Sequence, residues 1–245
     1  MKHEKWSPEL IAKRLAADGG CEISHETIYK WIWTAKHSNR SDQKEYKTLC
    51  KHLRYCGRQQ KRSNEKDNRG VITGRVGIDK RPKVVEYRTR IGDIEVDLMM
   101  GKDHKSALLV MTDRTTLVTM LEKLTSKNAE EVYRKMNKRL TNFESCWIKT
   151  LTFDNGKEFA YHHKIGKDLN AETYFTRPYT SQDKGTVENR IGVIRRFFPK
   201  KTDLRNVDEK RIKEVEKLLN YRPIRKFNYQ NPIEVLNNKI VALMG

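Results

Sequence analysis

The feature that most constrains the fold is a change of pattern near residue 91. Three apolar runs follow one another at residues 94–100, 106–113 and 115–121, with only short turns between them. Runs of this length and spacing predict three neighbouring antiparallel strands. A fourth run at residues 146–153 and a short fifth at 171–175 lie among segments with helical spacing, so the sequence predicts an α/β domain with a mixed sheet.

Two later segments, residues 128–140 and 184–198, repeat apolar side chains at three- or four-residue steps. This spacing predicts amphipathic helices that cover a sheet. In the second segment the repeat consists of Val187, Ile191, Ile194 and Phe198.

The first 35 residues predict two short helices around a Gly-containing turn. Ser7 and Ser24 are suited to cap the two helices, and Pro8 is suited to the first helical position. Such a pair matches a helix-turn-helix, whose second helix enters the major groove of DNA. A helical hairpin that only packs against a neighbour is the alternative. The outward residues of the second helix, which we expect to contact DNA, are His25, Glu26, Tyr29 and Lys30.

Charge supports a polyanionic partner. Lys and Arg number 51 against 32 Asp and Glu, which gives a net charge of +19, although a merely basic protein would have the same balance. Residues 36–90 lack periodicity and read as a basic linker, in which Arg58, Lys61 and Arg62 are candidate DNA contacts. We therefore expect a DNA-binding unit at 1–35, a linker at 36–90 and a main domain at 91–245.

Other sequence signals exclude a membrane or secreted protein. No run approaches the roughly 18 apolar residues that span a bilayer, and the N-terminus lacks the apolar stretch of a secretory signal. The four cysteines show no paired short spacing, so reduced thiols inside the cell are expected.

Three carboxylates approach the expected core. Asp97 lies inside an apolar strand, Asp154 follows one directly, and Glu188 adjoins Val187 on an apolar helix. Unpaired carboxylates are costly in a dry interior, and a hard divalent cation such as Mg²⁺ or Mn²⁺ is the ordinary solution. Each acid taken alone also fits a surface or salt-bridged carboxylate.

The flanking residues add a family resemblance. The chain reads RIGDIEVDLMM around Asp97, TLTFDNGKEF around Asp154 and SQDKGTVENRIGVIRRFFPK around Glu188, and it carries WSPELIAKRL near its start and IDKRP at 78–82. Together these motifs resemble the insertion-sequence-thirty (IS thirty) family of DDE transposases. The resemblance implies a ribonuclease-H-like integrase core with flanking helices, preceded by the helix-turn-helix unit.

The resemblance also implies a mechanism. Asp97, Asp154 and Glu188 match the family's metal-binding catalytic triad, which holds two Mg²⁺ or Mn²⁺ ions. The expected reaction nicks the ends of an insertion element and transfers the freed strand to target DNA. The expected partners are double-stranded DNA, namely terminal inverted repeats and target, and further copies of the chain in a homo-oligomer, acting in the bacterial cytoplasm at the nucleoid. The chain lacks a further N-terminal region usual in the family, so we expect a truncated member.

Supporting residues follow from the same match. Asp93 corresponds to a further family acid with a supporting role, and Asn155, Gly156 and Glu158 are expected to shape the turn after Asp154. Basic side chains around Glu188 are expected to hold phosphates, with a solvated helix face as the alternative. These are Lys184, Arg190, Arg195 and Arg196.

Two other functions compete with transposition. A decayed transposase would bind DNA without catalysis, and a ribonuclease-H-like nuclease would cut DNA without joining it. A tyrosine recombinase would need a nucleophilic Tyr beside an Arg/His cluster, and Tyr174, Tyr179 and Tyr221 lack that sequence setting.

Overall fold

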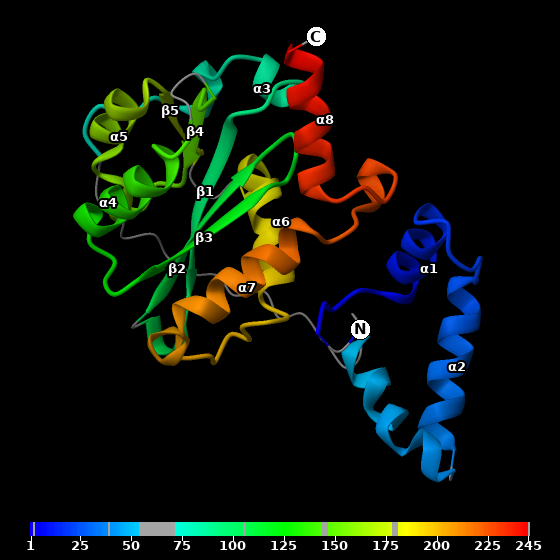
Figure 1. Cartoon of the computed structure of the whole chain (residues 1–245). Coiled ribbons are helices and arrows are strands. Elements are labelled where there is room, and N and C mark those ends of the chain that lie inside the picture. Colours follow the sequence, from blue (N-terminus) through cyan, green and yellow to red (C-terminus); the bar gives the residue numbers. More distant parts are fainter. Residues whose placement is uncertain are drawn as a thin grey trace. The chain divides into compact units, whose positions relative to one another are not determined.

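The structure of the chain is a computed structural model that describes residues 1, 3–38, 40–53, 72–104, 106–143, 147–177 and 181–244. It divides into two compact units (Figure 1). One consists of Met1–Lys66 with Tyr221–Val235, and the other of Asp67–Asn220 with Leu236–Gly245. Each unit is described by itself below.

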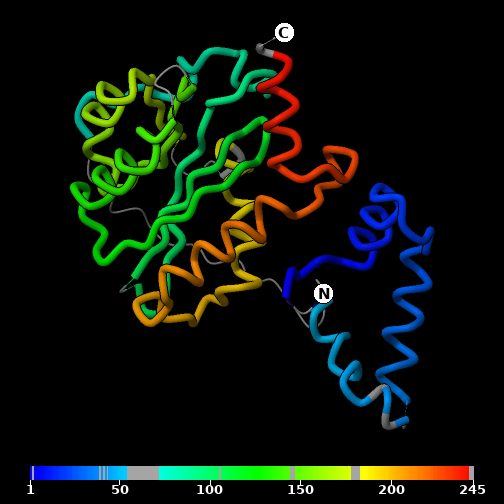
Figure 2. The backbone as a smooth tube through the Cα atoms, in the orientation of Figure 1, coloured from blue at the N-terminus to red at the C-terminus, as the bar shows by residue number. Residues whose placement is uncertain are grey.

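The second unit is built on a five-stranded mixed sheet with the order β3-β2-β1-β4-β5. Its strands are β1 (Asp93–Met100), β2 (Ala107–Asp113), β3 (Thr119–Leu124), β4 (Thr150–Phe153) and β5 (Glu172–Phe175). The first three form the predicted antiparallel meander, whose path can be followed in Figure 2. β4 is added parallel to β1, and β5 parallel to β4. This is the ribonuclease-H-like α/β arrangement that the sequence predicts.

The third strand begins later than predicted, at Thr119 instead of residue 115. The cause is the Asp113 carboxylate, which accepts hydrogen bonds from the backbone N–H groups of Thr115 and Thr116 and from that of Gly92. Asp113 thereby holds residues 114–117 in a turn, because a short acidic side chain competes with the strand ladder for these donors.

Helices cover both faces of the sheet (Figure 1). On one face lie α4 (Ala129–Leu140) and α5 (His162–Leu169), and on the other α6 (Gly185–Ile194) and α7 (Glu209–Asn220). The remaining α-helices of the chain are α1 (Pro8–Ala17), α2 (His25–His37), α3 (Val84–Tyr87) and α8 (Pro232–Met244). Short 3₁₀ segments occur at Ser41–His52, Ile78–Lys80, Lys102–His104, Lys157–Phe159, Ser181–Lys184, Leu204–Asn206 and Arg225–Phe227.

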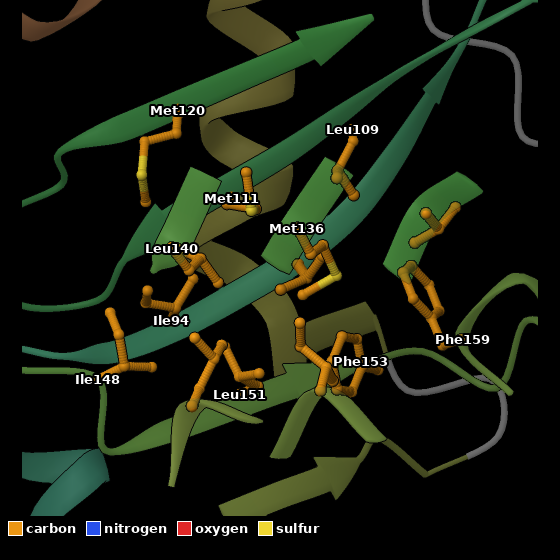
Figure 3. Close-up of a cluster of buried hydrophobic side chains, with 14 of the residues drawn as sticks. Ile94, Leu109, Met111, Met120, Met136, Leu140, Ile148, Leu151, Phe153 and Phe159 are labelled. Carbon is orange, nitrogen blue, oxygen red and sulfur yellow. The ribbon is translucent and has the colours of Figure 1, made fainter. Parts of the chain in front are cut away.

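The face toward α4 and α5 is an apolar core (Figure 3). β1 contributes Ile94, and α4 contributes Met136 and Leu140, all of which are almost fully buried. The start of α4 is confirmed at Asn128, whose side chain accepts a hydrogen bond from the Glu131 backbone N–H. A capped, amphipathic helix thus forms where local sequence predicts it.

The face toward α6 and α7 holds a second apolar cluster, which includes Val187, Ile194 and Phe198 of the predicted repeat, with Ile191 packed against it. α6 ends at Ile194, four residues before the predicted end, yet Phe198 still reaches the cluster from the following turn. The burial prediction is therefore confirmed, although the helix is shorter.

α7 also closes the free edge of the sheet at β3. Asn220 accepts from the Thr119 N–H through its side-chain oxygen and donates to the Thr119 carbonyl through its amide. One turn earlier, Glu216 accepts from the Leu121 N–H at 2.6 Å. These side chains occupy the hydrogen-bonding groups to which another strand would otherwise pair.

The first unit contains α1 and α2, and the predicted caps are confirmed. The Ser7 and Ser24 side chains accept hydrogen bonds from the Leu10 and Thr27 backbone N–H groups. Its small core is formed by Ile32, Leu49 and Cys50. The 3₁₀ segment Ser41–His52, which supplies the last two, lies in the stretch predicted to be a linker.

The segment Tyr221–Val235 belongs to the same unit. Tyr229 donates a hydrogen bond to Glu9 of α1, and Arg14 forms a 2.8 Å ion pair with Glu234. The helix-turn-helix geometry and the boundaries after residues 35 and 90 stay predictions. Within the described ranges, no helix is both long and apolar enough to cross a membrane.

Candidate active site

Strand β1 presents a row of three acids on one face of the sheet. Asp93, Glu95 and Asp97 occupy alternate positions, and alternate side chains of a strand point to the same side. The intervening Ile94 and Val96 point into the apolar core beneath α4. The acids therefore lie on the side of the sheet that α6 and α7 cover.

The neighbouring strand β4 faces this row with its own polar positions. Asp93 is paired in register with Thr150, and Glu95 with Thr152. Continuing this register by two residues brings Asp97 opposite Asp154, the residue that follows β4. Because the two strands are parallel, their carboxyl ends meet at one edge of the sheet, and that is why the two acids converge there.

The junction into β1 requires a glycine. Gly92 has a φ of +92°, and a Cβ atom there would lie 1.7 Å from the carbonyl oxygen of Trp147. Its own carbonyl accepts from the N–H groups of Lys149 and Thr150. The close approach of these two chain segments starts the β1–β4 pairing that aligns the two acids.

The first acid of the row, Asp93, is structural. Both of its carboxylate oxygens accept hydrogen bonds from Arg90, at 2.9 and 3.0 Å, and Thr150 donates to it as well. With 1% of its surface exposed, Asp93 has no access to a substrate. The supporting role that the resemblance implied for it agrees with this geometry.

The middle acid, Glu95, is fully buried and has two partners on different elements. One oxygen pairs with the Arg114 guanidinium, and the other accepts from the backbone N–H of Val187 at 2.8 Å. Arg81 of the IDKRP motif lies in the same layer and donates to Thr152 at 3.1 Å. Sequence reasoning missed these three side chains. The alternation of acids along an apolar strand was the available signal for Glu95.

Asp97 and Asp154 meet on the ammonium group of Lys184. The Lys184 Nζ lies 3.2 Å from Asp97 Oδ1 and 3.9 Å from Asp154 Oδ2, and it donates to the Val96 carbonyl at 3.2 Å. Lys184 is itself buried, whereas the two acids keep part of their surface exposed. The pair is therefore open to solvent on one side and closed by a cation on the other.

The electrostatics reflect crowding of negative charge. Burial raises the pKa of Asp97, the Asp154 carboxylate adds to the rise, and the Lys184 ammonium opposes it. Burial likewise raises the pKa of Glu158, with further contributions from Asp154 and Asp97. Carboxylates that raise one another's pKa values are characteristic of functional sites.

The turn after β4 is held as the DNGKEF motif predicts. The Asp154 side chain accepts from the Gly156 N–H at 2.9 Å. Asn155 donates to the Thr176 carbonyl, and its side-chain oxygen accepts from Arg75 at 2.6 Å. These bonds fix the backbone on which Asp154 stands.

Glu188 reaches the site from α6. It follows Val187, whose N–H is bound by Glu95, and its side chain is exposed. Burial raises the pKa of Glu188, and the charges of Asp97 and Glu95 raise it further. Glu188 is thus in electrostatic contact with the first of the two strand acids.

The donor chemistry of these acids fits a hard divalent cation. All candidate ligand atoms are carboxylate oxygens, and two of them already converge on a cationic group, the Lys184 ammonium. Within the ranges that the structure covers, no three His, Cys, Asp or Glu side chains lie close enough in their present positions to hold one metal ion.

The four predicted contacts of the first unit are exposed on α2. His25, Glu26, Tyr29 and Lys30 line a shallow surface hollow together with Trp33 and Thr34. A DNA contact by these residues stays a prediction.

For α6, the structure contradicts a phosphate contact by Arg190. Its side chain is buried and donates to the Thr119 hydroxyl at 2.9 Å and to the Leu219 carbonyl at 3.1 Å, and burial lowers its pKa to about 10. Arg190 lies three residues after Val187, on the apolar face of α6, so helical spacing was the overlooked signal. Lys184 is also buried and faces the acids instead of a surface.

The basic candidates that follow α6 are less buried than Arg190. Arg195 is half-buried and donates to the Met100 carbonyl at 2.6 Å, and Arg196 is partly exposed. Arg58, Lys61 and Arg62 lie outside the described residues.

Comparisons with known proteins place the chain among mobile-element proteins. It is 40% identical over 242 residues to the transposase for insertion sequence element IS4351 of Bacteroides fragilis, covering 97% of this chain and 72% of that protein. It is 31% identical over 242 residues to the transposase for IS1086 of Cupriavidus metallidurans, covering 95% and 69%. The transposase InsI for IS30A of Escherichia coli is 29% identical over 245 residues, covering 96% and 62%.

No protein-family model matches the chain. Among solved structures, the catalytic core domain of BIV integrase is similar with a TM-score of 0.47 and 16% identity, over 63% of this chain and 99% of that one.

Proposed function

Because the chain belongs to the IS30 family of insertion-sequence transposases, we propose that Asp97, Asp154 and Glu188 form the catalytic centre with which it nicks element ends and joins them to target DNA. The observation that carries this proposal is the convergence of Asp97 and Asp154 on a single cationic group at the shared edge of β1 and β4. A family enzyme of this chemistry needs carboxylates at that position.

The three acids have different mechanical roles. Asp97 and Asp154 stand on paired parallel strands, so their spacing is set by the sheet. Glu188 stands on a helix and is exposed, so its side chain can adjust to the ligand. Two divalent ions, Mg²⁺ or Mn²⁺, would be held by these acids and would supply activation of a water or 3′-hydroxyl and stabilisation of the leaving oxygen.

Lys184 has a role in the protein without metal. Its ammonium offsets the repulsion between Asp97 and Asp154 and lies between them, where it would compete with a metal ion. Tyrosine chemistry is not needed, because the acids act without a covalent protein–DNA intermediate.

The proposed substrate is double-stranded DNA, namely the terminal inverted repeats of the element and the target. The exposed face of α2 is the proposed reader of the ends, and the net charge of +19 favours the DNA backbone. We further propose that copies of the chain assemble on DNA to hold two ends together, at the nucleoid of the bacterial cytoplasm.

A strand-transfer assay tests the catalytic proposal. The full chain is incubated with pre-nicked element ends and target DNA in Mg²⁺ or Mn²⁺. We expect joined products from the wild type and none from Asp154→Asn. Asp168→Asn is the matched control, because it removes one carboxylate from α5, where Asp168 accepts hydrogen bonds from Tyr133 and Asn137.

The outcomes separate the competing functions. Cleavage without joining would indicate a nuclease, and binding of DNA with neither reaction would indicate a regulator. Equal joining by the wild type and Asp154→Asn would overturn the assignment of the centre.

A further inference from the structure

Glu95 is the buried middle acid of β1, and the role proposed for it rests on the proposed function of Asp97, Asp154 and Glu188. We propose that Glu95 is a positioning residue that binds the first turn of α6 to β1 and so sets where Glu188 stands relative to Asp97. Its carboxylate joins the two elements directly, through the 2.8 Å hydrogen bond from Val187 N–H.

α6 lacks a cap of its own. The first N–H groups of any helix have no partner within the helix, and a side chain at the N-cap position usually accepts one from the second or third residue. At α6 the N-cap is Lys184, which makes no such bond. Val187 is the third helical residue, and Glu95 accepts its N–H from another element. A carboxylate there also complements the positive end of the helix dipole.

The binding partners of Glu95 explain why a charged group is tolerated at 0% exposure. An unpaired carboxylate in the interior would be strongly destabilising. Arg114 provides the countercharge, and its own backbone N–H donates to the Asp93 carbonyl at 2.9 Å, which attaches it to β1. The arginine is therefore held in place by the same strand that carries the acid it neutralises.

A second attachment holds α6 beyond Glu188. Arg190 joins α6 to the Thr119 hydroxyl and to the last turn of α7 at the Leu219 carbonyl. Glu188 lies between these two attachments, one residue after Val187 and two before Arg190. When the Glu95 bond is lost, Lys184, the residue before α6, still attaches this end of the helix to β1, but the turn that carries Val187 and Glu188 is no longer bound to the strand at Val187. Because catalytic ligands must be held to about 0.5 Å, such a shift matters for metal binding.

The test uses the full chain and compares Glu95→Ala and Glu95→Gln with the control Asp93→Asn. Asp93 lies on the same face of the same strand and is equally buried and paired, but its partners are Arg90 and Thr150, with none on α6. Two quantities are measured: amide hydrogen exchange at Val187 without metal, and Mn²⁺ binding followed by the electron paramagnetic resonance signal of free Mn²⁺.

We expect Glu95→Ala to accelerate exchange at Val187 by about tenfold or more and to weaken Mn²⁺ binding by roughly 10- to 100-fold, the usual range for residues that support metal ligands. Glu95→Gln keeps an oxygen acceptor for the Val187 N–H, so its exchange rate at Val187 and its Mn²⁺ affinity should lie between those of Glu95→Ala and the wild type. A loss of stability alone would not explain such a partial recovery. It also carries the test if the alanine variant does not fold. Asp93→Asn should lower the melting temperature without changing either quantity.

The positioning role is wrong if both Glu95 variants match Asp93→Asn in exchange and in Mn²⁺ affinity. A wild-type chain that binds no Mn²⁺ would instead overturn the proposed catalytic centre. If the wild type binds no Mn²⁺ and amide exchange at Val187 is the same in Glu95→Ala as in the wild type, the bond between Glu95 and α6 is overturned as well. If exchange at Val187 is faster in Glu95→Ala, the bond is retained as a structural link between β1 and α6.

Discussion

The two faces of the sheet bury different chemistry, although the same strand contributes to both. Toward α4, β1 presents Ile94 and Val96 to a wholly apolar cluster. Toward α6, it presents Asp93, Glu95 and Asp97, each beside a cationic side chain. One side of β1 is thus packed as an ordinary core, and the other as a layer of paired charges.

The difference between the two sides of β1 shows how the domain tolerates buried charged groups. Buried charge pairs contribute little net stability, because desolvation offsets their attraction. Apolar burial contributes about 25 cal/mol per Å² and needs no partner of defined geometry. We infer that apolar burial on both faces of the sheet supplies most of the folding free energy, while the charged layer beside β1 holds functional groups at fixed positions. Four substitutions test this division.

The largest effect is expected at Asp97. Asp97→Asn should reduce strand transfer below detection, because the proposed site loses a ligand that no neighbouring strand position can replace. The measurement is the joined-product assay, with circular dichroism to show that the fold is kept. Retained joining at more than a few per cent would contradict the assignment of Asp97.

The same substitution has a pH signature without metal. Burial and the Asp154 charge raise the pKa of Asp97 although the Lys184 ammonium opposes the rise, so between the ordinary and the raised pKa the folded protein binds more protons than the unfolded chain. Stability linked to this group therefore declines as the pH rises through the raised pKa. Asp97→Asn should melt above the wild type near pH 7, and the difference should shrink as the pH falls toward the ordinary carboxyl pKa. A variant that melts lower at pH 7 would refute this.

The next largest effect, a loss of stability, is expected from a substitution in the apolar core beneath α4. Leu140→Ala empties a fully buried position of α4 and should cost about 2–5 kcal/mol in the free energy of unfolding, measured by urea denaturation. Mn²⁺ affinity of the folded fraction should stay unchanged, since Leu140 packs on the side away from the acids. A parallel fall in Mn²⁺ affinity would show that the two faces are not independent.

A smaller loss of stability is expected from a substitution beside the paired charges of β1. Thr152→Val keeps the shape of the side chain but removes the acceptor of the buried Arg81 Nη1 group, while the Arg81 Nη2 group keeps its bond to Glu86. Leaving a charged donor without its acceptor should cost about 1.5–3 kcal/mol. Thr141→Val is the control, because its hydroxyl is exposed and bonds only to the Asn137 carbonyl. Equal stability of the two variants would mean that the Arg81 bond contributes nothing.

The smallest effect is expected at Lys184, where a substitution should strengthen metal binding instead of weakening the protein. Lys184→Met removes the cation that competes for the space between Asp97 and Asp154. Mn²⁺ should bind roughly tenfold more tightly, equivalent to about 1.4 kcal/mol. Calorimetric titration measures this, with Lys157→Met as a control at an exposed position. Weaker Mn²⁺ binding by Lys184→Met would show that the lysine supports the site instead of competing.

Much of the architecture could be predicted because it depends on local sequence. The strands carrying Asp97 and Asp154 appeared within a few residues of their observed bounds, and the caps at Ser7 and Ser24 lie where the structure has them. Apolar periodicity and capping act over a few neighbouring residues, so the sequence displays them directly.

Predictions failed where a side chain took its role from a distant segment. Arg190 was expected on the surface because arginines are usually exposed, but it lies under α7 and bonds to Leu219. Helical spacing after Val187 could have indicated that Arg190 is buried, but its partner Leu219 comes from α7 and cannot be read from the residues around Arg190.

By itself, the sequence determined the order of strands and helices, the family, and which three carboxylates are candidates for catalysis. Only the tertiary structure decided that Lys184 occupies the space between Asp97 and Asp154 and that Glu95 holds the helix of Glu188. The reason is physical. Glu95 and Val187 are 92 residues apart, so their bond depends on how α6 packs against β1, which no local pattern specifies.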